Sequence, residues 1–166
     1  MLALCPVLAV AAPPKNVLAD ALSKEIEAVG ARKVLEKYYD TPAWMNSIMP
    51  GIEGASTKWL SVAQKLQSGA DGAASEDIAL ALYFGALPRN PLRVIPLLTA
   101  IYGGSVEERC TIGFGAEIPK GGVSSYLGTI RMKLKAAKTD SERAMASACL
   151  RGLKQTRIDA KAQGIK

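Results

Sequence analysis

Two neighbouring apolar segments constrain the fold of this chain more than any other feature. Residues 78–87 contain no charged side chain, and residues 92–102 are nearly as apolar. Between them lies Pro88-Arg89-Asn90-Pro91, which supplies Asn90 as a helix N-cap and Pro91 as a first helical residue. A membrane-spanning helix needs about 20 apolar residues, so neither segment is long enough. We therefore predict a buried helical hairpin, 75–87 and 91–102, at the centre of the molecule, with Pro96 kinking or ending its second helix.

The rest of the chain also carries the periodicity of helices. The cleanest helical stripe has apolar residues three and four positions apart, at Val123, Tyr126, Leu127, Ile130 and Leu134. Ser75, Ser105 and Thr139 are each placed to start a helix. Aromatic residues make up 5% of the 166 residues, and no segment alternates as a strand would. We predict an all-α fold, a compact bundle of about six or seven helices.

The N-terminus has the features of an export signal. Residues 1–12 form an uncharged apolar segment that ends in small residues, and Ala9-Val10-Ala11 matches a cleavage site before Ala12. No Lys or Arg precedes the apolar segment, so a retained apolar arm or a first strand is the alternative. We predict a signal peptide over residues 1–11, a single helical domain over 12–166 and a periplasmic location.

The number of cysteines agrees with export. Removing residues 1–11 would discard Cys5 and leave Cys110 and Cys149, a pair that can form a disulfide in an oxidising compartment. The alternative is two buried, reduced thiols that pack as small apolar groups. We favour the disulfide, because the N-terminus points independently to the same compartment.

The chain offers no recognisable catalytic or metal-binding motif. It has no histidine, no Cys-x-x-Cys, no Gly-x-Ser-x-Gly and no Walker loop, so we predict no catalytic residue, no metal and no cofactor. Glu53, Glu107 and Glu108 are the best carboxylates for a glycosidase-like pair. Adjacent acids on one helical turn point in different directions, so we interpret Glu107 and Glu108 as solvated or helix-capping residues.

Positive charge is concentrated near the C-terminus. Residues 131–166 hold ten Lys or Arg against three acids, which leaves the remainder of the +6 chain slightly negative. Arg151, Lys154, Arg157 and Lys161 recur at helical spacing and predict one basic face, either solvated or used to bind an acidic partner. The segment contains no aromatic residue for base stacking, which argues against nucleic acid. The glycine-rich loop 111–122, with Glu117 and Lys120, is the other candidate binding surface.

From Gly51 onward, the order of short motifs resembles a group of small, uncharacterised exported proteins of proteobacteria. The shared elements are Trp59-Leu60, Asp71 to Glu76, Ala86-Leu87-Pro88-Arg89-Asn90-Pro91, Val106 to Cys110, and Ala148-Cys149-Leu150. This resemblance implies an all-helical periplasmic domain with its two cysteines paired, and no known activity. In architecture and compartment alone, the chain is also similar to the immunity proteins of type VI secretion amidases.

These observations favour a non-catalytic periplasmic protein, of immunity, inhibitor or adaptor type, that binds a protein partner. An envelope enzyme acting on peptidoglycan or another polymer is the first alternative, and a cleft holding two acids would favour it. A basic nucleic-acid-binding module is the second. The sequence does not indicate an oligomeric state.

Overall fold

The computed structural model describes residues 17–114 and 117–165, so the predicted signal peptide over 1–11 lies outside the described residues. Within these ranges the protein is helical, contains no strand and has a disulfide between Cys110 and Cys149. The predicted all-α class and the predicted bridge are therefore confirmed. The described ranges form nine continuous helices rather than six or seven, because several of the helices are short. None of these helices is long and apolar enough to cross a membrane.

The elements occur in a simple order along the chain. They are α1 (Ala19–Val29), α2 (Ala31–Tyr38), η1 (Trp44–Ile48), α3 (Met49–Glu53), α4 (Thr57–Gln67), α5 (Gly72–Leu80), η2 (Ala81–Ala86), α6 (Leu87–Arg89), α7 (Pro91–Tyr102), α8 (Val106–Cys110), α9 (Gly122–Leu134) and α10 (Asp140–Ala162). The two η segments are π-helical turns that continue directly into their neighbours, so η1–α3 and α5–η2–α6 are each one helix.

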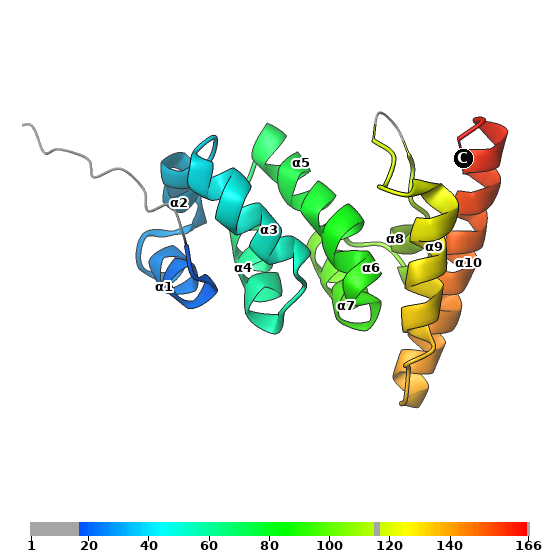
Figure 1. The fold of residues 1–166 in the computed structure, drawn as a ribbon. Helices are drawn as coiled ribbons and strands as arrows, with labels where there is room; N and C mark the ends of the chain where they lie inside the picture. Colours follow the sequence, from blue (N-terminus) through cyan, green and yellow to red (C-terminus); the bar gives the residue numbers. More distant parts are fainter. Residues whose placement is uncertain (1–16, 115–116, 166) are drawn as a thin grey trace, which may run out of the picture.

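The helices pack as consecutive antiparallel pairs in chain order, from α1 and α2 at one end to α9 and α10 at the other (Figure 1). The pair formed by α5–η2–α6 and α7 occupies the middle, as the apolar segments predicted. Val94, Ile95 and Leu98 of α7 are fully buried there. The central location follows from composition, since a helix with apolar residues on several faces needs neighbours on each of them.

Two details of the central pair differ from the prediction. Its first helix begins at Gly72, with Asp71 as the N-cap residue, and not at Ser75. Ala73 and Ala74 are strong helix formers, and they extend the helix toward its N-terminus. Pro96 was predicted to kink or end the second helix, and it does not end it, because α7 continues to Tyr102. A proline in a helix removes one backbone donor, and the packed flanks of α7 maintain the helix despite that loss.

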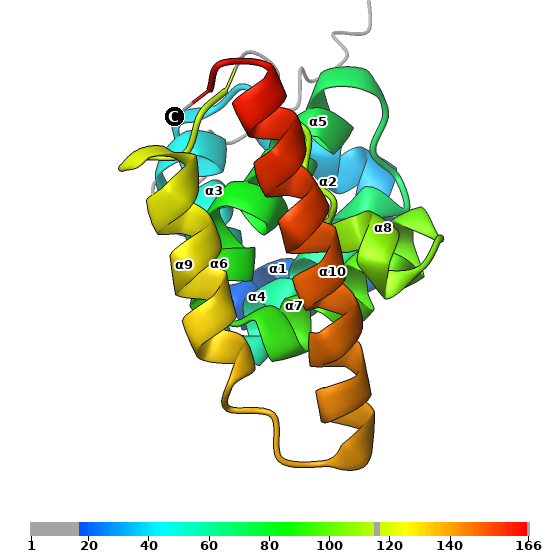
Figure 2. The same ribbon diagram turned by 90° about the vertical axis from the view of Figure 1, so that its right-hand side faces the viewer.

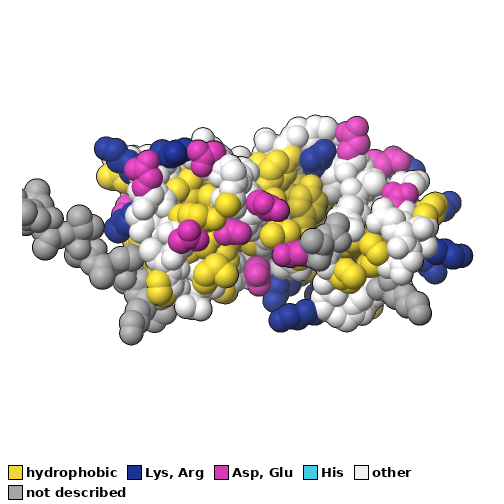
Figure 3. All heavy atoms as spheres, turned by 90° about the horizontal axis from the view of Figure 1, so that it is seen from above, with side chains coloured by type: hydrophobic (Ala, Val, Ile, Leu, Met, Phe, Trp, Pro, Cys, Tyr) yellow, Lys and Arg dark blue, Asp and Glu magenta, His cyan; other side chains and the backbone are white. Residues whose placement is uncertain are grey.

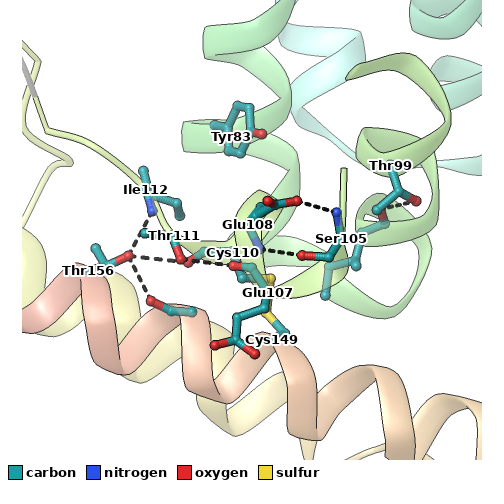
Figure 4. Close-up of a disulfide and its surroundings, with 12 residues drawn as sticks. Tyr83, Thr99, Ser105, Glu107, Glu108, Cys110, Thr111, Ile112, Cys149 and Thr156 are labelled. Carbon is teal, nitrogen blue, oxygen red and sulfur yellow. Dashed lines mark hydrogen bonds between the residues drawn. A yellow bond between two sulfur atoms is a disulfide. The ribbon is translucent and has the colours of Figure 1, made fainter. Parts of the chain in front are cut away.

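The short helix α8 is attached to the long helix α10 by covalent, polar and steric contacts (Figure 4). The Cys110–Cys149 bridge joins them with a Cα–Cα distance of 5.1 Å. The buried Thr156 hydroxyl accepts a hydrogen bond from the Ile112 backbone N–H at 2.7 Å. At Gly152 a Cβ atom would lie 2.3 Å from the Glu107 carbonyl oxygen, so the two backbones touch. The segment 107–112 is thus fixed on α10.

Candidate functional site

A groove between α9 and α10 is the most distinctive surface of the described structure. The two helices form an antiparallel hairpin whose outer side faces the viewer in Figure 2. The groove has a volume of about 470 Å³, and the buried side chains of Leu127 and Leu153 form its floor. Gly128 contributes no side chain, and no described residue from another element approaches within 4 Å of the place where its Cβ would be. An open apolar channel results, of the size that binding sites commonly have.

Three cations line this groove: Arg131 of α9, and Lys154 and Arg157 of α10. All three side chains are exposed, and none forms an ion pair with another described residue. No acidic residue from ranges 17–114 and 117–165 lines the groove. Three like charges around one channel repel one another, and an anionic ligand would relieve that repulsion while its apolar parts cover the floor.

The structure divides the predicted basic face of α10. Lys154 and Arg157 belong to the groove, whereas Arg151 turns toward α8, where its Nε donates to a Glu107 carboxylate oxygen at 2.7 Å. Lys161 is exposed one turn beyond Arg157 and does not line the groove. Sequence reasoning missed Arg131. The available signal was the helical stripe of α9, because Arg131 follows Leu127 by four residues and therefore lies on the same side of the helix.

The other two predicted residues, Glu117 and Lys120, line a second cleft of about 530 Å³. Glu53 and Arg89 line it as well, from the C-terminal ends of α3 and α6. That Glu53 and Arg89 share a cleft with Glu117 and Lys120 could not be predicted from local spacing, because these four residues come from three distant segments. Their meeting depends on how the helix pairs stack.

The acids considered for catalysis have different surroundings. Glu108 accepts a hydrogen bond from the Ser105 backbone N–H at 2.6 Å in a capping box, which holds the pKa of its carboxyl below the ordinary range. Glu107 bonds to Arg151. Glu108 therefore has the helix-capping role that its sequence context indicated, whereas the ion pair of Glu107 with Arg151 was not predicted. Glu53 and Glu117 do share a cleft, but Glu117 is exposed and lacks the apolar enclosure that a general acid of a glycosidase requires.

Viewed from above, acidic side chains alternate with apolar ones in the middle of the face (Figure 3). Lys and Arg side chains project from the end formed by α9 and α10 and also from the opposite end, where α1 and α2 lie. No protein-family model, characterised protein or solved structure matches this chain. The geometry and charge of its own surfaces therefore carry the functional argument.

Proposed function

We propose that this protein is a non-catalytic, periplasmic binding protein that recognises an acidic segment of a protein partner in the groove between α9 and α10. The observation that carries the proposal is the convergence of Arg131, Lys154 and Arg157 on an apolar floor, with no acidic residue among the described residues that line it. A protein segment is favoured over nucleic acid because none of the described lining residues has an aromatic side chain on which bases could stack.

The exposed apolar side chains support the same conclusion. Seven large apolar side chains are exposed in the described structure, and three of them, Met132, Leu150 and Ile158, belong to α9 or α10 and are between 40% and 65% exposed. Leu150 lines the groove itself. Apolar residues surrounded by cations suit an amphipathic segment with acids on its polar side. The disulfide, together with the signal-like N-terminus, supports the periplasm as the compartment, because such bridges persist in oxidising environments.

The test combines a photocrosslinker at position 150 with charge variants. A periplasmic extract would be irradiated with the protein carrying the crosslinker, and with the same protein bearing Arg131→Gln, Lys154→Gln and Arg157→Gln. The control variant carries Lys133→Gln, Lys135→Gln and Lys138→Gln, which change the net charge equally at exposed positions outside the groove. We expect a discrete crosslinked protein with wild type and control, and its loss with the groove variant.

Direct binding then tests the chemistry. We expect an acidic peptide taken from the crosslinked site to bind the wild-type protein. Its affinity for the groove variant should be at least about tenfold lower, which corresponds to about 1.4 kcal/mol of binding free energy. Equal weakening by both variants would reduce the effect to net charge and contradict the groove. Tighter binding of a single-stranded oligonucleotide than of the peptide would replace the proposal with the nucleic-acid alternative.

A further inference from the structure

We propose that the cleft between α3, α6 and α9 binds a free α-amino acid with an apolar side chain, held at its carboxylate by Arg89 and at its ammonium by Glu53. This site is separate from the groove between α9 and α10, and the inference does not depend on the proposed function. The cleft volume of about 530 Å³ lies within the range of small-ligand sites.

Arg89 is held ready to bind a carboxylate. Its Nη1 atom donates to the backbone oxygens of Gly85, at 2.8 Å, and Glu53, at 3.2 Å. These two bonds fix the guanidinium at the C-terminal end of α3. They leave Nε and Nη2 without a described partner, and those two atoms form the edge that binds a carboxylate in bidentate fashion. Because the orientation is set in advance, binding loses little side-chain entropy.

Glu53 supplies the opposite charge in the same cleft. Its side chain crosses directly over Gly85, where a Cβ atom would lie 2.3 Å from the Glu53 Cγ atom. Glu53 is half-buried, and its carboxylate makes no hydrogen bond or ion pair with another described residue. Arg89 and Glu53 thus lie in one cleft without pairing. A ligand that carries ammonium and carboxylate on a single carbon can satisfy both at once.

The remaining lining sets the charge and polarity of the ligand. Glu53 and Glu117 balance Arg89 and Lys120, so the cleft is neutral in sum and favours a zwitterion over an anion. Phe84 and Tyr126 contribute an aromatic wall, with ring centroids 6.0 Å apart. Such a wall favours an aliphatic or aromatic side chain on the ligand.

The test uses free leucine and free phenylalanine as probes. Saturable chemical-shift changes at the Gly85 amide and the Arg89 Nε–H would be measured by NMR on the full chain. We expect both probes to bind, and N-acetyl-leucine and leucine amide to bind at least about tenfold more weakly, because each lacks one of the two charges. Absence of saturable shifts with leucine and phenylalanine would overturn the proposal. Equal binding of N-acetyl-leucine would also overturn it, leaving a simple carboxylate site.

Variants locate the site. Glu53→Gln and Arg89→Lys should each weaken leucine binding at least about tenfold, since Lys keeps the charge but loses the bidentate edge. Arg93→Lys is the matched control, because Arg93 bonds to Thr57 and does not line the cleft. Arg89→Lys could unfold the end of α3, so Glu53→Gln, which leaves both backbone bonds of Arg89 in place, provides an independent result. Unchanged leucine affinity in Glu53→Gln would contradict the assigned role of Glu53.

Discussion

At the scale of single residues, the contact between α8 and α10 depends on two small side chains. Gly152 leaves room for the Glu107 carbonyl and the Cys110 backbone. Thr156, the one buried polar residue of the described core, supplies an acceptor to Ile112 and is itself 3.2 Å from the Cys110 carbonyl oxygen. Without Thr156 the Ile112 N–H would be buried with no partner, which costs about 1–3 kcal/mol.

We expect Gly152→Ala to destabilise the protein by about 1–3 kcal/mol, because the new methyl group would overlap backbone atoms that the bridge holds in place. Gly128→Ala is the matched control on α9. No atom lies within 4 Å of its Cβ position, and alanine has the higher helix propensity, so this variant should be neutral or more stable by up to about 1 kcal/mol. Urea unfolding of both variants measures the difference. Equal changes in stability for the two variants would show that helix propensity, and not the contact between α8 and α10, determines the effect of Gly152→Ala.

The sequence predicts some of these residues better than others. The disulfide could be predicted because cysteines are few and their number changes with export. Cys149 could also be placed on the inner face of its helix by periodicity. Gly152 and Thr156 share that face, but a glycine and a threonine are common on exposed helix surfaces as well. Only the approach of α8 gives them a role, and local spacing does not specify which helix covers them.

At the scale of elements, the π-helical turn η2 accommodates Pro88. In a π-helix the N–H of a residue bonds to the oxygen five positions earlier, as Leu87 does to Leu82. Pro88 has no N–H, so the Tyr83 oxygen loses its helical donor. The Tyr126 hydroxyl of α9 replaces that donor at 2.6 Å. This hydrogen bond also connects the central helix pair to the C-terminal pair.

We expect Tyr126→Phe to lower the free energy of unfolding by about 1–3 kcal/mol, because it leaves the partly buried Tyr83 oxygen without a partner. Tyr39→Phe is the control, since the Tyr39 ring packs on Trp44 while its hydroxyl makes no hydrogen bond to a described group. Thermal unfolding of the two variants beside the wild type measures the effect. A similar loss in both would assign it to the aromatic substitution itself.

Helix starts were predicted from residue types typical of N-caps. Ser105 and Thr139 each form the capping box expected of a helix N-cap. Asn90 and Pro91 begin α7 as predicted, although the Asn90 side chain makes no capping hydrogen bond. The η1 and η2 turns were not predicted, because a π-helical turn depends on tertiary contacts and leaves no periodic signature of its own. The sequence predicted a basic face on the last helix but not the groove between two helices, for a related reason. Lys154 and Arg157 follow from spacing on one helix, whereas Arg131 joins them through the pairing of two helices.

At the scale of the whole molecule, buried tyrosines make stability depend on alkaline pH. Burial raises the pKa of Tyr102 to about 12 and raises that of Tyr126 further. In the unfolded chain both ionise near pH 10. Above pH 10 the unfolded state therefore releases protons that the folded state retains, and the free energy of unfolding falls as pH rises. We expect this decline between pH 10 and 12 to be shallower in Tyr126→Phe. If the free energy of unfolding fell equally with pH in the wild type and in Tyr126→Phe, the alkaline decline would not come from Tyr126.

The disulfide is the second feature that determines the stability of the whole molecule, because it stabilises the end that carries the groove. It closes a loop across a sequence separation of 39 residues, which includes α9. Loop-closure entropy gives about 4 kcal/mol for a bridge of this length. We expect Cys110→Ala combined with Cys149→Ala to lose about that amount in urea unfolding. Added reductant should lower the stability of the wild type alone, and an unchanged wild type would indicate that the thiols are already reduced.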